Sequence, residues 1–214
     1  MTLDGKIATA SGESKWITGE RSRRVAMQLR FAVDAVLLGI NTVLADNPSL
    51  TARGPTGRVR KPLRRIVLDA LARTPPDAVV ASDEFAALTT VVVSRAAPVR
   101  RVKALAQRVR VLVAPASKGR IHLRWLLKRL GTEGVTSLLV EGGGEVNAAF
   151  LEAGLAQRVT FFYAPKILGG RDARRGVAGQ GAKRLADLIE LREVQWRRVG
   201  GDLLLSASVG KAQD

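Results

Sequence analysis

Short runs of apolar, β-branched residues alternate with helical patterns along most of the chain. Val25 and Leu29 recur at helical spacing after Thr18, which predicts a helix with Thr18 as its N-cap. The apolar run 34–40 predicts a buried strand. A short helix over 41–45 should follow and end before Pro48, because a residue preceding proline is displaced from the α region. Further strands are predicted at 65–69, 89–94, 109–113, 135–140 and 159–163, and helices at 98–108, 123–131 and 145–154.

The order of these elements predicts an α/β fold. Strands that alternate with helices favour a mostly parallel central sheet with helices on both faces. The segments 193–199 and 202–209 flank Gly200-Gly201 and predict an antiparallel β-hairpin at the C-terminal end, at the edge of that sheet. The basic, glycine- and proline-rich segment 54–64 is expected to be a loop. No repeat or linker interrupts the pattern, so we expect one domain over residues 1–214.

Composition excludes several kinds of chemistry. The 214 residues are 46% hydrophobic and 25% charged, as in an ordinary globular protein. The chain has no Cys and one His, His122, which excludes disulfides, Cys-ligated zinc and a cysteine nucleophile, and we expect no metal site. No apolar run is long enough for a membrane helix and no signal peptide is recognisable, so we expect a cytoplasmic protein without a membrane partner.

The charge is unusual, at +16 with an isoelectric point of about 11.4. Such a protein attracts phosphorylated metabolites and polyanions alike. Nucleic-acid binding without catalysis is therefore one alternative function. However, the basic residues are scattered along the chain, and aromatic residues make up only 4%, too few for a base-stacking surface. We expect a solvated basic surface and no nucleic-acid partner.

The segment 138–149 carries the strongest local signal. A predicted strand ends in Glu141, three glycines follow (Gly142 to Gly144), and a helix then begins. Glycines let a backbone approach a diphosphate, and a helix N-terminus offers free N–H groups. The Rossmann pattern would need a third glycine at Asn147, so the segment predicts either another kind of dinucleotide site or a plain tight turn. Glu141 stands at the carboxyl end of its strand, where open α/β sheets bind ligands.

Two further polar segments are candidates for a site. Asp46 ends the predicted short helix, where the helix dipole disfavours an anion, so the carboxyl group needs a partner, solvent or a proton. Alternatively, Asp46 is a turn-forming residue before Asn47-Pro48. Arg53 is either an anchor for an anion or one more surface arginine.

The motifs taken in order make the chain resemble a known family, the reductase domain of the bifunctional riboflavin-biosynthesis deaminase/reductase. They are M-T-L-D-G-K-I-A, S-G-E-S-K-W-I-T, D-A-V-L-L-G, T-V-L-A-D-N-P-S-L-T-A-R, R-I-V-L-D, V-E-G-G-G and A-P-K-I-L-G-G. The resemblance spans nearly the whole chain. It implies a dihydrofolate-reductase-like fold, a homodimer, and NADPH-dependent reduction of 5-amino-6-(5-phosphoribosylamino)uracil to the ribitylamino product.

The resemblance also assigns roles by motif position. It implies substrate contacts at Ser14, Arg30, Leu50, Arg53 and Glu141. It implies NADPH contacts at Trp16, Thr42, Asp46, Gly142, Gly143, Gly144, Glu145, Val146, Asn147, Ala148 and Ala149. On this basis Arg30 and Arg53 hold the sugar phosphate, and Glu141 and Asp46 are the catalytic candidates, with Asp46 as a proton relay. Arg95, which follows a predicted strand, is a candidate contact for the 2′-phosphate of NADPH.

The chain departs from the family in three respects. Without Cys it has no zinc deaminase motif, so we expect a reductase with no deaminase domain. Family members usually begin upstream of Met1 with a strand that carries a substrate-contacting lysine, and Ala70 stands where the family often has serine. Two alternatives therefore remain beside nucleic-acid binding: another pterin or pyrimidine reductase of the same fold, and an inactive paralogue.

Overall fold

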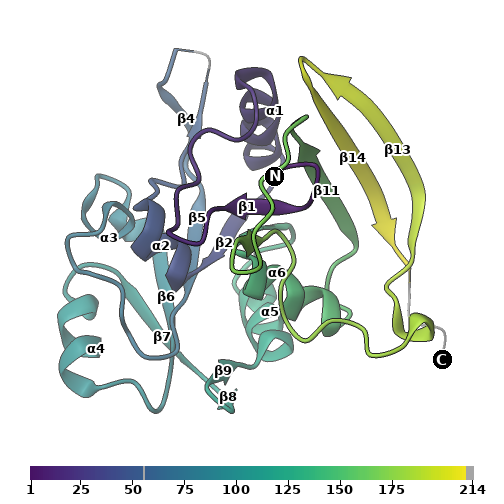
Figure 1. The fold of residues 1–214 in the computed structure, drawn as a ribbon. Coiled ribbons are helices and arrows are strands. Elements are labelled where there is room, and N and C mark those ends of the chain that lie inside the picture. The colour runs from purple at the N-terminus through teal and green to yellow at the C-terminus, as the bar shows by residue number, and fades with distance from the viewer. Residues whose placement is uncertain (55, 211–214) are drawn as a thin grey trace. The chain divides into compact units, whose positions relative to one another are not determined.

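The computed structural model describes residues 1–54 and 56–210, which form two compact units (Figure 1). One unit comprises Met27–Gly143, and the other combines Met1–Ala26 with Gly144–Asp214. Pro55, within the predicted loop, and residues 211–214 lie outside the described part. The single domain expected over 1–214 stays a prediction.

The unit formed by 27–143 is built on a five-stranded parallel sheet in the order β10-β2-β5-β6-β7. Its strands are β2 (Ala35–Gly39), β5 (Arg64–Leu68), β6 (Thr89–Ser94), β7 (Arg110–Ala114) and β10 (Leu138–Gly142). All five were predicted from the sequence, and their parallel arrangement is confirmed. β2 and β6 are buried along their whole length, which explains why they read as continuous apolar runs.

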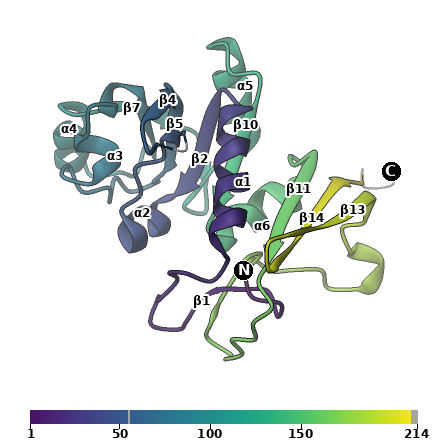
Figure 2. The same ribbon diagram turned by 90° about the horizontal axis from the view of Figure 1, so that it is seen from above.

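Helices cover both faces of this sheet. They are α2 (Ile40–Asp46), α3 (Val79–Ser82), α4 (Val99–Ala106) and α5 (Leu123–Thr132), and a 3-10 turn spans Ala86–Leu88. Val36 and Leu38 share one face of β2, because alternate residues of a strand point the same way, and belong to one buried cluster with Val80 and Leu105. Figures 1 and 2 show α3 and α4 on one side of the sheet and α5 on the other.

Strand β10 begins at Leu138 instead of the predicted Val135. The two residues before it are bound to Asp34, at the start of β2. One carboxylate oxygen of Asp34 accepts hydrogen bonds from the backbone and hydroxyl groups of Thr136 and Ser137, at 2.7–3.0 Å. These four bonds hold the pKa of Asp34 well below its usual range. The sequence prediction missed them because the two partners are far apart in the chain.

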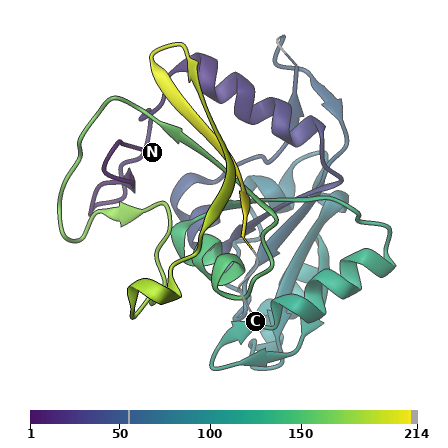
Figure 3. The same ribbon diagram turned by 90° about the vertical axis from the view of Figure 1, so that its right-hand side faces the viewer.

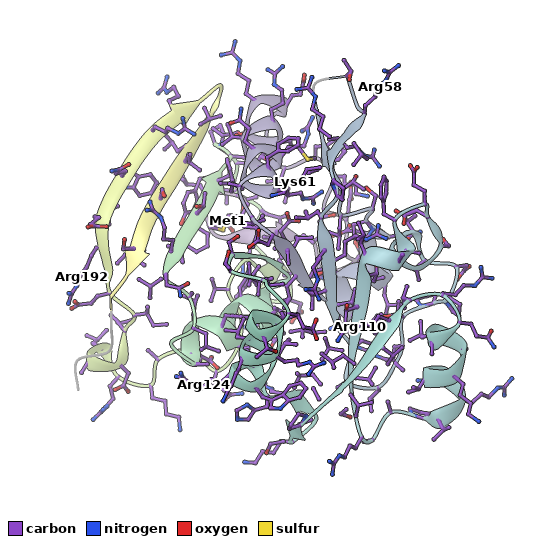
Figure 4. All side chains as sticks on the ribbon, turned by 180° about the vertical axis from the view of Figure 1, so that it is seen from behind. Met1, Arg58, Lys61, Arg110, Arg124 and Arg192 are labelled. Atoms are coloured by element: carbon purple, nitrogen blue, oxygen red, sulfur yellow. The ribbon has the colours of Figure 1, made fainter. Side chains whose placement is uncertain are left out.

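The expectation of a plain loop over 54–64 is wrong in part. β3 (Ala52–Arg53) and β4 (Val59–Lys61) pair as a short antiparallel hairpin. The Lys61 ammonium donates to the carbonyl groups of Phe31 and Val33, at 3.1 and 2.7 Å, and so ties this hairpin to the chain before β2. Figure 4 shows Arg58 at the outer end of the hairpin. A second small hairpin, β8 (Ala116–Ser117) with β9 (Arg120–Ile121), follows β7.

The other unit contains a three-stranded antiparallel sheet in the order β11-β14-β13. β13 (Leu191–Val199) and β14 (Asp202–Val209) form the predicted hairpin, a long twisted ribbon in Figure 3. β11 (Arg158–Tyr163) pairs with β14, so these strands form a sheet of their own and not the expected edge of the parallel sheet. The unit also holds α6 (Gly144–Glu152), the strand pair β1 (Lys6–Ala8) with β12 (Arg174–Arg175), and a 3-10 turn at Leu185–Asp187.

The first long helix, α1, spans Glu20–Phe31, so Thr18 is not its N-cap. The Asp202 carboxylate instead accepts hydrogen bonds from the Gly19 backbone and the Ser22 hydroxyl, at 2.8 and 2.6 Å. A carboxylate at this position satisfies free N–H groups and complements the helix dipole. Among the helices of residues 1–54 and 56–210, none is long and apolar enough to cross a membrane.

Glu133 joins three arginines at the amino-terminal ends of the parallel strands. Its carboxylate accepts from Arg64 at 2.7 Å, from Arg110 at 2.5 Å and from Arg129 at 2.8 Å, and its side chain is only 17% exposed. Figure 4 labels Arg110 on β7. Hydrogen bonds from Arg110, opposed in part by desolvation, lower the pKa of Glu133 to about 2.

We predict that Glu133→Gln lowers the free energy of unfolding by about 1–2 kcal/mol near neutral pH, because three guanidinium groups lose their shared anion. A depressed pKa in the folded state means that the contribution of Glu133 is complete above its unfolded pKa. It is lost as pH falls towards 2. Urea denaturation of both proteins between pH 6 and pH 2 should show the difference shrinking in acid. Glu190→Gln, at an exposed position, serves as control, and a difference that does not change with pH would contradict the prediction.

Candidate functional site

A bidentate ion pair at the carboxyl end of β10 joins two of the predicted site residues. Arg30, in the last turn of α1, donates from Nε and Nη2 to the two carboxylate oxygens of Glu141, at 2.6 and 2.7 Å. Its Nη1 donates to the carbonyl of Thr51, at 2.8 Å. The side chains are 17% and 25% exposed, so the pair is largely shielded from water. Three segments that are distant in the sequence therefore meet at one guanidinium group.

Arg53 lies in the same segment as Thr51 and lines a depression. Its Nε donates to the Thr51 hydroxyl at 2.8 Å and its Nη2 to the Ser49 hydroxyl at 3.0 Å. The depression has a volume of about 490 Å³, and Arg58 lines it as well. Two guanidinium groups and two hydroxyl groups are donors suited to a phosphate group.

Leu50 is buried between these polar residues. Its side chain is 1% exposed and belongs to the hydrophobic core, and its φ of +52° is in the left-handed region. A substrate can therefore contact the backbone of Leu50 but not its side chain. Hydrogen bonds made by the residues before and after Leu50 stabilise this unusual backbone conformation.

Arg65 is a supporting residue that the sequence analysis did not identify. Its side chain is 1% exposed, and its two terminal nitrogens bind Asp83 at 2.7 Å each. Its Nη1 also donates to the carbonyl of Ser49, at 2.9 Å. A buried guanidinium needs such a set of acceptors, and here one of them belongs to the segment that carries Arg53. The available signal was the arginine that opens the otherwise apolar strand run 65–69, which indicates a buried charge with a partner.

Each glycine of the triglycine turn meets a different structural requirement. Gly142 has a φ of +97°, which residues with a side chain rarely adopt. The Gly143 N–H donates to the hydroxyl of Thr42 at 2.9 Å, so the predicted cofactor contacts on β10 and α2 touch each other. A Cβ at Gly144 would collide with the carbonyl of Arg175. The last glycine is thus required by packing within its own unit, and not by a ligand.

The other residues of α6 that are predicted to contact the cofactor differ in their exposure and in their hydrogen bonds. Asn147 donates its amide to the carbonyl of Gly176 at 2.8 Å, and Ala148 is 2% exposed. Glu145 is exposed, whereas Val146 and Ala149 are half-buried. The exposed and half-buried residues of the first turns are therefore the ones placed to meet a ligand.

Asp46 and Arg95 lie where the sequence analysis expected them. Asp46 is the last residue of α2, is half-buried, and precedes Asn47, whose left-handed conformation ends the helix. Its position at a helix C-terminus is thus confirmed. Arg95 is exposed and directly follows β6.

The loop that carries Ser14 and Trp16 belongs to the other unit. Trp16 is 65% exposed, and the Arg23 guanidinium carbon lies 4.4 Å from the centre of its ring. Ser14 is half-buried. Lys166 donates to the carbonyl groups of Trp16 and Ile17, at 3.3 and 2.8 Å, and so holds this loop. Lys166 belongs to the A-P-K-I-L-G-G motif, to which the sequence analysis gave no role.

Asp4 of the first motif binds the same A-P-K-I-L-G-G segment. Its carboxylate accepts from the backbone of Leu168 and Gly169, at 3.1 and 2.8 Å. The side chain of Thr2 and these two backbone groups lower the pKa of Asp4 to about 2. The first and last motifs of the resemblance therefore depend on each other.

Residues 1–54 and 56–210 contain no group of three or more His, Asp or Glu side chains arranged to hold a metal ion. The carboxyl end of β10 and the neighbouring segment 49–53 do bring together the Glu141 carboxylate, the guanidinium groups of Arg30 and Arg53, and a glycine turn. This set can bind a phosphate ester and accept hydrogen bonds from hydroxyl groups. It suits an anionic organic ligand.

Comparison with known proteins agrees with this description. Residues 1–205 match the family model described as the RibD C-terminal domain. The chain is 44% identical over 209 residues to a protein of Methanothermobacter thermautotrophicus named 2,5-diamino-6-ribosylamino-4(3H)-pyrimidinone 5′-phosphate reductase, covering 98% of this chain and 94% of that protein. It is 40% identical to the riboflavin biosynthesis protein RibD of Actinobacillus pleuropneumoniae, covering 96% of this chain and 54% of that protein.

Solved structures show the same fold. Acinetobacter baumannii RibD superposes with a TM-score of 0.78 at 27% identity, over 98% of this chain and 56% of that one. A deaminase/5-amino-6-(5-phosphoribosylamino)uracil reductase of Thermotoga maritima gives 0.69 at 29% identity, over 98% and 54%. The chain thus spans about half the length of the RibD proteins that it matches. The dihydrofolate-reductase-like α/β fold expected from the sequence is confirmed, and the chain belongs to the RibD C-terminal domain family.

Proposed function

We propose that the chain catalyses the NADPH-dependent reduction of 5-amino-6-(5-phosphoribosylamino)uracil to the ribitylamino product, in riboflavin biosynthesis. The observation that carries the proposal is the Glu141–Arg30 pair beside the Arg53 depression. It combines a carboxylate that can accept from sugar or pyrimidine groups with donors for a phosphate ester. Family membership and the name of the Thermotoga maritima protein support the same reaction.

A second candidate substrate comes from the archaeal relative. Its name specifies the 2,5-diaminopyrimidinone ribosylamine phosphate, which carries an amino group where the uracil carries an oxo group. The two substrates share the sugar phosphate and the carbon to be reduced. The group at that one ring position decides between them, so both compounds have to be compared on the purified protein.

Arg53 is the residue that we assign to the substrate phosphate. It already binds two hydroxyl groups, and Arg58 lines the same depression. Arg30 uses three of its five N–H groups on Glu141 and Thr51, which leaves two for the substrate. We therefore assign to Arg30 the orientation of the Glu141 carboxylate as well as the expected substrate contact.

The residues present fit a nicotinamide dinucleotide. The left-handed Gly142 turns the chain sharply after β10, and the Thr42 hydroxyl fixes the Gly143 backbone. The first turn of α6 follows directly and supplies backbone N–H groups. Thr42, Gly142 and Gly143 would hold part of the diphosphate. The first turns of α6 and Trp16 are contacts that the resemblance implies. When bound, the cofactor would supply the hydride that reduces carbon 1′ of the opened sugar imine.

The chain itself has to orient the sugar and supply a proton. Glu141, fixed by Arg30, accepts from the hydroxyl groups exposed when the ring opens. The imine nitrogen takes up one proton as its carbon is reduced, which balances the reaction. Asp46, half-buried at the end of α2, is assigned to relay that proton, as a carboxyl group that can take up and release one.

Purified protein tests this function directly. Oxidation of NADPH should require the phosphoribosylaminopyrimidine and should yield the ribitylamino product by mass spectrometry. Turnover with dihydrofolate alone would favour another reductase of this fold. Salt-dependent binding of DNA or RNA without turnover would favour the nucleic-acid alternative.

We predict that Arg53→Ala lowers kcat/KM about 10- to 100-fold, mainly through KM, since a charge-assisted phosphate contact is lost. The dephosphorylated substrate should be a poor substrate for the wild type, and Arg53→Ala should not make it poorer. Steady-state kinetics with both substrates check this coupling, with Arg60→Ala, an exposed residue of β4, as control. If Arg53→Ala lowers kcat/KM equally with both substrates, Arg53 does not bind the substrate phosphate.

Asp46→Asn should lower kcat about 100-fold if Asp46 moves the proton, because the amide cannot do so. The dissociation constant of NADPH, measured by fluorescence quenching, should stay within about threefold of wild type. If turnover is retained while NADPH binding weakens, Asp46 is a cofactor contact only.

We also propose that the protein is a homodimer. The C-terminal hairpin exposes Val194, Trp196 and Leu203 by 45%, 56% and 39%, which is apolar surface suited to a contact with a second copy. Sedimentation should give twice the chain mass of 22.9 kDa. Trp196→Glu should shift the mass to that of one chain, whereas a wild-type monomer at micromolar concentration would contradict the proposal.

A further inference from the structure

The loop that precedes α1 is held by cationic side chains from two other segments of its unit. Three consecutive carbonyl groups of this Trp16 loop, residues 14–18, accept hydrogen bonds: those of Trp16, Ile17 and Thr18. The ammonium group of Lys166, which follows β11, binds the first two at 3.3 and 2.8 Å. Arg23, in α1, donates from Nη1 to the third at 2.8 Å. We call these two side chains the cation clamp.

Arg23 fixes the indole ring of the loop as well as its backbone. Its guanidinium carbon lies 4.4 Å from the centre of the Trp16 ring. A cation in this position is attracted by the electron-rich face of the ring. The start of α1 is itself held, because the Asp202 carboxylate binds the Gly19 N–H and the Ser22 hydroxyl. One guanidinium group therefore joins the ring and the backbone of the loop to a helix whose start is fixed.

Lys166 reaches the loop from a backbone that is held on both sides. Its N–H donates to the carbonyl of Ala164 at 2.7 Å, and its carbonyl accepts from the Leu3 N–H at 2.8 Å. Two residues further on, the Asp4 carboxylate accepts from the N–H of Leu168 at 3.1 Å. Lys166 is exposed, so its two bonds to the loop cost side-chain entropy. Because the backbone of Lys166 is already fixed, no further ordering of that segment is needed when these bonds form.

We propose that Lys166 and Arg23 are positioning residues of the reductase, and that the cation clamp holds the Trp16 loop in its binding conformation before a ligand arrives. The inference rests on the proposed function, in which Ser14 and Trp16 contact ligands. Residues 14–18 are exposed or half-buried, so apolar packing contributes little to the order of this loop. Neither cation needs to touch substrate or cofactor, because each acts through the loop that it binds.

The clamp predicts which kinetic constant changes when it is lost. A loop without its anchors has to be ordered when the ligand binds, and that entropic cost is taken from the binding free energy. KM then rises, whereas kcat changes little, because the ordered complex is the same in both proteins. Lys166→Arg keeps a cationic donor for carbonyl groups. Lys166→Met keeps most of the apolar stem and removes the donors, so the two variants together isolate the hydrogen bonds.

Steady-state kinetics with saturating NADPH and varied phosphoribosylaminopyrimidine test this expectation. Lys166→Met should raise KM for the pyrimidine about three- to tenfold and leave kcat within about twofold of wild type. Lys166→Arg should recover most of the loss, and Arg23→Met should act in the same direction as Lys166→Met. Lys183→Met, at an exposed lysine of the same unit, should behave like the wild type.

Fluorine NMR of the ligand-free protein tests the clamp without catalysis. The chain has three tryptophans, Trp16, Trp125 and Trp196, so labelling with 5-fluorotryptophan gives three resonances, and Trp16→Phe identifies the one from the loop. Lys166 binds backbone carbonyl groups, yet Lys166→Met should shift or broaden the Trp16 resonance, because the loop that carries the ring loses two anchors. The resonances of Trp125 and Trp196 should stay unchanged, which verifies that the variant is folded.

The two measurements separate the clamp from the proposed function. An unchanged KM or an unchanged Trp16 resonance in Lys166→Met would overturn the inference and leave the reductase function standing. A lower kcat at unchanged KM would also overturn it, because Lys166 would then take part in the chemical step. A wild type that reduces neither pyrimidine, but whose Trp16 resonance responds to Lys166→Met, would overturn the reductase function alone.

Discussion

The ion pair of Arg30 and Glu141 is the interaction on which the organisation of the site depends. It spans 111 residues of sequence and joins the end of α1 to the carboxyl end of β10. Both carboxylate oxygens are bound to one planar group, so the carboxylate cannot rotate without losing two charge-assisted bonds. The third bond, to the Thr51 carbonyl, extends the same control to the segment before Arg53. One side chain thereby sets the positions of the Glu141 carboxylate and of the segment to which we assign the substrate phosphate.

A second arginine, which is buried, stabilises this arrangement. Arg65 is held by Asp83 and in turn holds the carbonyl of Ser49, two residues from Thr51. The segment 49–53 is therefore fixed by guanidinium groups on two sides. Buried ion pairs of this kind contribute little net stability compared with apolar packing, but they define one geometry. In this molecule, part of the large arginine content serves internal structure and does not add to the basic surface.

The parallel sheet could be predicted from the sequence because its strands are buried on both faces, and a strand such as 89–94 then appears as an unbroken apolar run. The position of Glu141 at the end of a strand and that of Asp46 at the end of a short helix followed from the same pattern. The partners of the side chains could not be predicted. Whether Arg30 faces Glu141, or Asp202 meets Gly19, depends on contacts between segments more than 100 residues apart. The separate antiparallel sheet was missed for a similar reason, since periodicity identifies a strand but not its neighbour.

The division of the chain has a consequence for how it is synthesised. The unit of Met27–Gly143 is continuous, so its sheet can assemble while the rest is still being translated. The other unit combines the segment before Met27 with the segment after Gly143. Asp202 binds the start of α1, and Lys166 binds the Trp16 loop. The residues before α1 therefore acquire their final surroundings only after the segments that contain Lys166 and Asp202 have emerged from the ribosome, and until then the loop that carries Ser14 and Trp16 lacks its anchors.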